Sequence, residues 1–189
     1  MTVLMWLVVG YHVASRLAYV GYAGVALSRQ KRCHSFTARW GIEPGFRRFR
    51  RVAAIVMIND GASFVVVCLV TPHTLHLALP AIVVIPVGAL LVFLGVAVKV
   101  WAGAALGARA YYWYDFFNPA AVIPQGRGPY RVLRNPMYTV GYLPTYGLAL
   151  LTASLPGLAA AVFDQAAILV FYRLVEKPHV EQLGGAGGA

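Results

Sequence analysis

The stretch GPYRVLRNPMY, residues 128–138, sets two arginines and two tyrosines between apolar runs at about 78–106 and 137–154. A membrane-spanning helix needs about 20 consecutive apolar residues, and both runs approach or exceed that length. Polar and aromatic side chains at the end of such a run indicate the boundary between hydrocarbon and water. The fold therefore depends on how many spans surround this stretch and on the side of the membrane where it lies.

The composition is typical of a membrane protein. The 189 residues are 60% hydrophobic and 12% charged, whereas a soluble domain carries about 25% charged residues. Hydropathy predicts five spans, at about 2–27, 51–71, 78–106, 137–154 and 157–175. We therefore expect an all-α helical bundle in one domain over residues 1–182, in which the last two spans form a helical hairpin. A flexible Gly/Ala tail is expected at 183–189.

The basic residues predict the topology. Eight of the 16 Lys and Arg residues lie between positions 29 and 51, whereas the turns at 71–76 and 153–157 contain none. The positive-inside rule then places the loop 28–50, the stretch 107–136 and the C-terminus in the cytoplasm, and the N-terminus outside. The loop 28–50 favours contact with anionic lipid. We expect no nucleic-acid partner, because no nucleic-acid-binding motif accompanies the charge.

Ionisable side chains also occur inside the predicted spans, where burial in hydrocarbon is costly. Arg16 lies mid-span, with His12 one helical turn before it. Asp60 and Asp164 lie near the middle of the second and fifth spans. We expect Arg16 to pair with Asp60 or Asp164 and to tie the bundle together; a proton or ion pathway is the alternative. Lys99 lies near the cytoplasmic end of its span, so its ammonium can reach the interface.

The aromatic run YYWYDFF, residues 111–117, lies where the third span meets the cytoplasm. One interpretation is an aromatic belt at the membrane surface. A belt needs no acid, however, and Asp115 lies in the middle of this run. Tyrosine and tryptophan faces attract cations, so the run is a candidate pocket wall for an ammonium or sulfonium group.

The side chains of residues 128–138 indicate an anion site or a helix entrance. Arg131 and Arg134 are donors that can hold a carboxylate or phosphate in a bidentate manner. Pro136 is suited to begin a helix, and Asn135 can cap it. The alternative is a capped, positively charged helix entrance that only sets the topology. The two cysteines, Cys33 and Cys68, lack the spacing of a metal site, and we expect no metal.

GPYRVLRNPMY, taken together with EKPH at 176–179, resembles the membrane-embedded methyltransferases, the superfamily of isoprenylcysteine carboxyl methyltransferases and phospholipid N-methyltransferases. In that superfamily a Gly-Pro-Tyr-Arg…Arg-His/Asn-Pro-x-Tyr stretch precedes a helical hairpin, and a Glu-Glu or Glu-x-Pro segment follows it. The resemblance covers about 107–182. NPMY with EKPH is more similar to the phosphatidylethanolamine N-methyltransferase branch, which shows Asn-Pro-Met-Tyr and Glu-Glu-Pro-Phe at these places.

The resemblance implies a cytoplasmic site for S-adenosylmethionine. The residues that it implies for this cofactor site are Arg131, Arg134, Asn135, Pro136, Tyr138, Gly141 and Glu176. An amine acceptor must also lose a proton, and the candidate bases near the implied site are Asp115, His179 and Glu181. The chain departs from the family pattern in three places. Asn135 replaces the commoner His, Gly141 comes one residue later than the usual glycine, and Lys177 replaces a frequent second glutamate.

The resemblance thus implies a methyltransferase that uses S-adenosylmethionine and acts on a membrane lipid, such as the phospholipid amine phosphatidylethanolamine. The alternatives are methyl transfer to a carboxyl or thiol group of a lipophilic, isoprenylcysteine-like substrate, and a non-enzymatic membrane scaffold or transporter subunit. We expect the protein in the cytoplasmic (inner) membrane of a bacterium, with its active site on the cytoplasmic face. No protein partner is predicted.

Overall fold

The computed structural model describes residues 2–121, 128–133 and 135–186, and these residues form helices and turns only. The long helices are α1 (Val3–Cys33), α3 (Ile42–Val70), α4 (Ala81–Ala110) and α6 (Leu155–Phe171). The shorter helices are α2 (Thr37–Trp40), α5 (Leu143–Leu151) and α7 (Lys177–Ala186). Three 3-10 turns and one π-helical turn complete the elements, namely η1 (Tyr114–Phe116), η2 (Gly128–Arg131), η3 (Val140–Tyr142) and the π turn η4 (Tyr172–Glu176). The predicted all-α fold is confirmed.

Among the described residues, four helical segments are long and apolar enough to cross a membrane, and they extend over Val3–Cys33, Ile42–Val70, Ala81–Phe116 and Leu155–Leu183. The predicted span at 137–154 differs, because it contains only a shorter apolar segment, Val140–Leu151. Twelve helical residues extend about 18 Å, which is less than the roughly 30 Å of a hydrocarbon core. The helical part of 137–154 is therefore too short to span the hydrocarbon core. It begins inside the bundle rather than at its end.

Turns before α5 explain why this segment is short. The N–H groups of Tyr138 and Thr139 both donate to the Asn135 carbonyl oxygen, at 2.9 and 3.1 Å. Asn135 itself has φ 52°, in the left-handed region. The prediction that Asn135 caps a helix beginning at Pro136 is therefore wrong. The helix α5 begins seven residues later, at Leu143, with Pro144 in its first turn.

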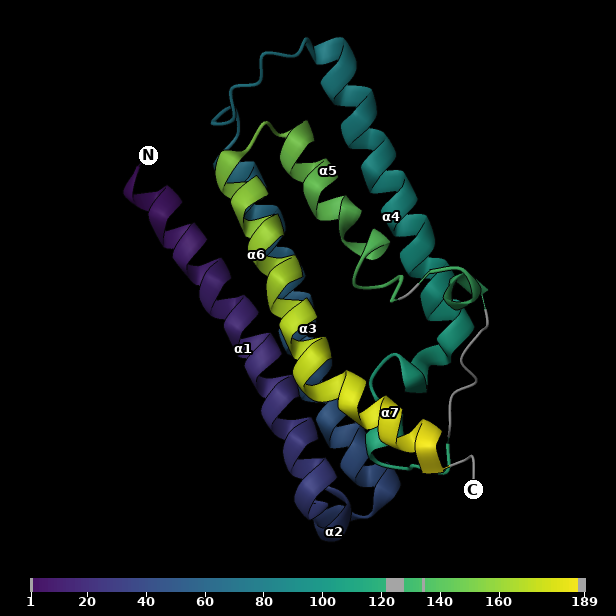
Figure 1. The fold of residues 1–189 in the computed structure, drawn as a ribbon. Helices are drawn as coiled ribbons and strands as arrows, with labels where there is room; N and C mark the ends of the chain where they lie inside the picture. Colours follow the sequence, from purple (N-terminus) through teal and green to yellow (C-terminus); the bar gives the residue numbers. More distant parts are fainter. Residues whose placement is uncertain (1, 122–127, 134, 187–189) are drawn as a thin grey trace.

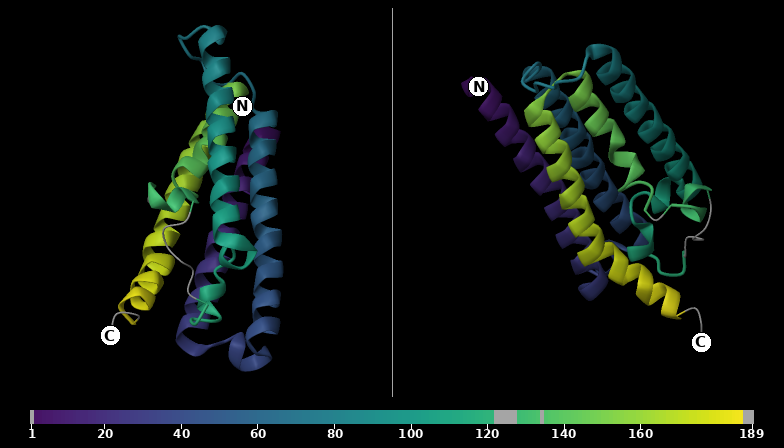
Figure 2. Two further views of the ribbon diagram at one scale, coloured as in Figure 1. Left: turned by 90° about the vertical axis from the view of Figure 1, so that its right-hand side faces the viewer. Right: turned by 45° about the horizontal axis from the view of Figure 1, so that its top comes forward.

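The two ends of the bundle differ in their connections (Figures 1 and 2). The N-terminus, the connection 71–80 and the turn between α5 and α6 lie at one end. At the other end lie α2, η1 and the C-terminal α7; we call it the basic end, because the basic residues between 29 and 51 lie there. This separation agrees with the predicted arrangement of the connections. Which end faces the cytoplasm remains a prediction.

The α5–α6 hairpin is present as predicted, and close backbone packing holds α5 against α4. At Gly147, an added Cβ would lie 2.5 Å from the Gly88 carbonyl oxygen, and at Gly95 it would overlap the Pro144 ring. Small residues are common where membrane helices approach closely. Because this contact extends along both helices, α5 lies alongside the first half of α4, and the stretch before α5 lies alongside the second half (Figure 1).

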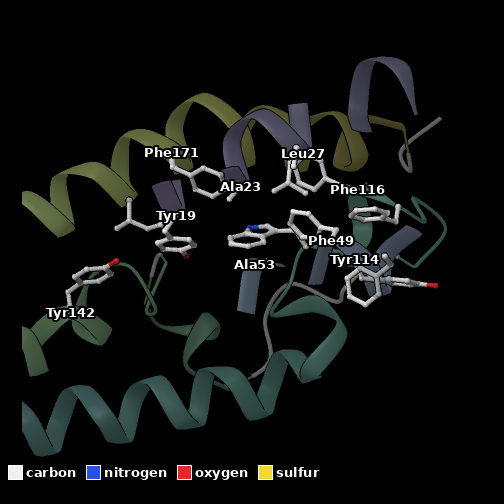
Figure 3. Packing of buried hydrophobic residues seen from close by; sticks show 14 residues of the cluster. Tyr19, Ala23, Leu27, Phe49, Ala53, Tyr114, Phe116, Tyr142 and Phe171 are labelled. Atoms are coloured by element: carbon white, nitrogen blue, oxygen red, sulfur yellow. The ribbon is translucent and has the colours of Figure 1, made fainter. Parts of the chain in front are cut away.

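The largest apolar cluster lies toward the basic end and is rich in aromatic rings (Figure 3). Phe49, on α3, is fully buried and contacts the ring of Trp113 with centroids 6.3 Å apart. Trp113 in turn packs against Phe171, at the end of α6, with centroids 5.3 Å apart. This cluster fixes the segment after α4 against α1, α3 and α6, and it thereby holds the aromatic run at a defined place.

A buried ionic network joins α1, α3 and α6 in the middle of the bundle. Arg16 Nη2 lies 2.7 Å from Asp60 Oδ2, and Arg16 Nε lies 2.8 Å from Asp164 Oδ1. Arg16 Nη1 also donates to the Tyr142 hydroxyl at 3.1 Å. His12 Nε2 lies 3.2 Å from Asp164 Oδ1. The predicted pairing of Arg16 is confirmed, and the structure shows both acids as partners rather than one.

Candidate functional site

A small cavity near the basic end of the bundle combines aromatic side chains with one carboxylate. Its aromatic walls are Tyr111, Trp113, Tyr130 and Tyr138, and its carboxylate is Glu176. The remaining lining residues are Leu106, Ala110, Asn135 and Met137. Thus the run after α4, the stretch 128–138 and the turn η4 after α6 meet at one place, although they are far apart in the sequence.

The carboxylate of Glu176 is held by one of its oxygens. The Tyr138 hydroxyl donates to Glu176 Oε2 at 2.8 Å, and the Trp113 indole N–H donates to the same oxygen at 3.3 Å. Within the described part of the chain, Oε1 has no hydrogen-bond partner. Glu176 ends the π-helical turn η4, an element that often occurs at functional sites. The arrangement fixes the carboxylate through Oε2, and none of the described residues occupies its other oxygen.

Two lining residues have unusual backbone conformations. Trp113 has φ 55° and ψ 45°, and Asn135 has φ 52°. A left-handed conformation is strained for a bulky residue and persists only where the surroundings impose it. For Trp113 those surroundings are the aromatic contacts with Phe49 and Phe171. The strain places the Trp113 indole N–H beside Glu176, where a regular continuation of α4 would not hold it.

The tyrosines of the stretch 128–138 remain hydrogen-bond donors at neutral pH. Burial, and next the negative charge of Glu176, raise the pKa of Tyr130 above its ordinary value. The same two causes raise the pKa of Tyr138. A tyrosine beside a carboxylate is thus kept neutral and keeps its O–H. The cavity therefore holds one fixed acceptor group beside the neutral phenols of Tyr130 and Tyr138.

A second pair of predicted residues lies next to this site. His179 Nε2 lies 3.1 Å from Asp115 Oδ2, and both side chains are buried. The imidazole stacks on the Phe116 ring with centroids 3.7 Å apart. A carboxylate that orients a buried imidazole is a common arrangement for proton transfer. The structure therefore brings together Asp115 and His179, two of the three candidate bases.

The other predicted site residues are placed differently. Glu181 is exposed and lies 3.6 Å from Lys177 in an ion pair on α7, away from the cavity lining. Arg131 is exposed and does not line the cavity, and Arg134 lies outside the described residues.

Two predicted residues of this region are buried in packing contacts. Pro136 is fully buried, and its carbonyl oxygen accepts the N–H of Gly141 at 2.8 Å. Gly141 is also buried, and an added Cβ would lie 3.2 Å from that same oxygen. Both shape the turn that presents Asn135 and Tyr138 to the cavity. The tail expected from residue 183 is helical through Ala186, as part of α7.

Sequence reasoning missed part of the cavity. Tyr130 was not among the predicted site residues, although it lies inside the motif that suggested the site. Trp113 belongs to the run expected to form a pocket wall, but its hydrogen bond to Glu176 was not predictable. The signal for both was the type of residue rather than its position, since aromatic faces suit a cationic ligand.

The chemistry of this cavity suits a positively charged organic group. Aromatic faces attract an ammonium or sulfonium, and a carboxylate adds charge attraction and a hydrogen-bond acceptor. The cavity volume is about 40 Å³, whereas sites for drug-sized ligands measure roughly 300–1,000 Å³. A nucleoside-sized ligand therefore needs more space than the cavity encloses in this structure.

Comparisons with known proteins place the site inside a recognised sequence family. The family described as phospholipid methyltransferase matches residues 83–185, which include every lining residue of the cavity. A phosphatidylethanolamine N-methyltransferase of Meyerozyma guilliermondii is 33% identical over 153 residues, which are 74% of this chain and 17% of the relative. Enzymes of the same name from Clavispora lusitaniae and Chaetomium globosum are each 31% identical, over 72% and 71% of this chain. They are covered to 17% and 14%, so this chain spans about a sixth of the length of such relatives. No solved structure matches the chain.

Proposed function

This chain belongs to the phospholipid methyltransferase family, and we propose that it transfers a methyl group from S-adenosylmethionine to an amine-bearing membrane phospholipid such as phosphatidylethanolamine. The observation that carries the proposal is the cavity at the basic end, in which Glu176 offers one carboxylate oxygen between aromatic walls. An aromatic cavity with a carboxylate suits both the sulfonium of the donor and the amine of the acceptor.

The residues of the cavity fit S-adenosylmethionine, which supplies when bound an electrophilic methyl group on a positively charged sulfur. Glu176 would accept a hydrogen bond from its ammonium or ribose through Oε1, because Oε2 is already held by Tyr138 and Trp113. Tyr130 would contribute an aromatic face, and Asn135 an amide. Roles for Arg131 and Arg134 in holding the carboxylate of the cofactor remain predictions.

The chain's own part in the reaction is positioning, exclusion of water and removal of a proton. Methyl transfer is an in-line displacement, so holding both partners in one geometry lowers the barrier most. Aromatic walls keep water from the reacting groups. The acceptor nitrogen must be neutral to react. We assign the loss of its proton to His179, whose Nε2 lies 3.1 Å from Asp115 Oδ2.

The basic end of the bundle suits an anionic membrane surface. Among the described residues, no basic side chain from 29–51 forms an ion pair within 4.0 Å. Arg39 and Arg48 both lie against the Trp40 ring, at 4.9 and 4.8 Å from its centroid. Tryptophan and uncompensated arginines are typical of contact with lipid headgroups. We therefore propose that this end faces the cytoplasm and contacts anionic lipid; placement in a bacterial inner membrane stays a prediction.

The experiment that tests the function is a transfer of labelled methyl groups. The purified protein is incubated with methyl-labelled S-adenosylmethionine and vesicles that contain phosphatidylethanolamine, and the lipids are then separated. Label on the amine phospholipid supports the proposal, and the Glu176→Gln variant should label far less. Label only on a carboxyl or thiol acceptor would favour the isoprenylcysteine-like alternative. An absence of any transfer, together with no cofactor binding, would contradict an enzymatic role.

A further inference from the structure

Lys99, on α4, is a cation with no carboxylate partner. All six Asp and Glu residues of the chain lie in the described part, and none of them lies within 4.0 Å of its ammonium. The Lys99 side chain is exposed, and its Nζ lies 5.6 Å from the centroid of the Tyr142 ring. A lysine in an apolar helix that lacks an internal partner is a candidate for contact with an external anion.

No ion pair within 4.0 Å ties this lysine to the buried ionic network. Arg16, Asp60 and Asp164 carry a net charge of −1 together, so the positive charge of Lys99 balances them formally. However, both acids already contact Arg16 at 2.7 and 2.8 Å, while Lys99 lies beyond 4.0 Å from each of them. The ammonium therefore remains available for a negatively charged ligand that reaches α4 from outside.

The position of Lys99 relates it to the cavity. Residues three, four and seven apart lie on the same face of a helix, so Lys99, Gly103 and Leu106 form one line along α4. Leu106 lines the cavity, and a Cβ at Gly103 would lie 3.9 Å from the Tyr111 ring. Seven residues of helix correspond to about 10 Å. Lys99 thus lies about 10 Å from the cavity along α4. It is on the face of α4 that lines the cavity, and it is nearer to the middle of the bundle.

Polar backbone reaches the same depth. The turns η2 and η3 both pack against α4. A Cβ at Gly128 would lie 2.7 Å from Ala105, and a Cβ at Gly141 would lie 3.8 Å from Lys99 Cγ. Hydrocarbon excludes such turns unless protein or a polar ligand covers them. A lipid headgroup beside Lys99 would therefore lie next to polar protein rather than among acyl chains.

We propose that Lys99 binds the phosphate of the acceptor phospholipid while the amine of the same lipid enters the cavity; this deepens, and rests on, the proposed methyl transfer. In a leaflet at the basic end, the amine lies outermost, the phosphate lies next, and the acyl chains point toward the middle of the bilayer. Glu176 and Lys99 follow the same order along the bundle. Lysine is a common phosphate ligand through its point charge, so Lys99 selects phospholipid amines over amines without phosphate.

The test compares two acceptors in the same detergent micelles, phosphatidylethanolamine and sphingosine, a lipid amine without phosphate. For Lys99→Met we expect the KM for phosphatidylethanolamine to rise about tenfold or more, as for a lost charge-assisted contact. Its kcat and the KM for sphingosine should change little. Lys99→Arg should restore most of the affinity. Lys177→Met, on the exposed α7 ion pair, is the matched control and should behave as the unsubstituted protein.

Binding is measured separately, so that the two proposals can fail independently. Titration of the solubilised protein with phosphatidylethanolamine should show about tenfold weaker binding for Lys99→Met, even if the protein methylates no lipid. Equal phosphatidylethanolamine binding and KM for Lys99→Met and the unsubstituted protein would overturn the inference and leave the methyl transfer standing. Weaker binding of S-adenosylmethionine alone would reassign Lys99 to the cofactor. Loss of thermal stability without rescue by arginine would make its role structural.

Discussion

Replacing Glu176 by glutamine isolates the charge of the cavity, because the two side chains have nearly the same shape. Glutamine keeps one carbonyl oxygen, which can still accept from Tyr138 and Trp113 in place of Oε2. What is lost is the second oxygen, Oε1, and the negative charge. The substitution should therefore leave the fold intact while removing the acceptor offered to the ligand.

The magnitude follows from the single contact that disappears. A hydrogen bond to a charged group contributes about 1.5–3 kcal/mol, which corresponds to about a tenfold to hundredfold change in affinity. We expect Glu176→Gln to weaken S-adenosylmethionine binding by that factor. The loss should not be larger, because the aromatic walls formed by Tyr111, Tyr130 and Tyr138 are unchanged.

Calorimetric titration of the protein in detergent measures this affinity directly, and the melting temperature reports on the fold. Glu181→Gln provides the matched control, because Glu181 is exposed and lies in an ion pair with Lys177. It should bind the cofactor as the unsubstituted protein does. Equal affinity in both variants and in the unsubstituted protein would refute the assignment of Glu176. A large fall in melting temperature for Glu176→Gln would show a structural role instead.

Other features of the chain give further predictions. Arg16→Met should destabilise the protein by about 3–5 kcal/mol, since it leaves buried carboxylates unpaired. In denaturation experiments, adding Asp60→Asn should recover part of this loss, and strictly additive effects of the two substitutions would contradict their coupling. Asp115→Asn should lower kcat with phosphatidylethanolamine about tenfold or more without weakening cofactor binding, because His179 loses the negative charge that stabilises its protonated form; an unchanged kcat would exclude the pair from proton removal. Cysteines introduced at Thr74 and Arg39 should be labelled from opposite sides of the membrane, and labelling from one side would disprove the predicted topology.

The sequence by itself determined the class of the fold and the identity of the motif residues. Long apolar runs require helices in a membrane, because every backbone polar group must be satisfied within its own segment. The pairing of Arg16 with an acid was predictable for a related reason, since an unpaired charge is expensive in hydrocarbon and few acids were available. Both inferences depend on local composition and on solvation, which the order of the residues carries directly.

Only the tertiary structure decided how the site is assembled. The left-handed conformations of Trp113 and Asn135 arise from packing and turns that hydropathy does not encode. The early end of the apolar segment before Leu143 follows from those turns and from its close contact with α4. Likewise, Tyr138 meets Glu176 because the α5–α6 hairpin returns the chain to the same end of the bundle, and Trp113 meets it because Trp113 packs on Phe171; these residues lie 38 and 63 positions from Glu176 in the sequence. Such contacts between distant segments depend on the packing of the whole bundle, and no local pattern in the sequence specifies them.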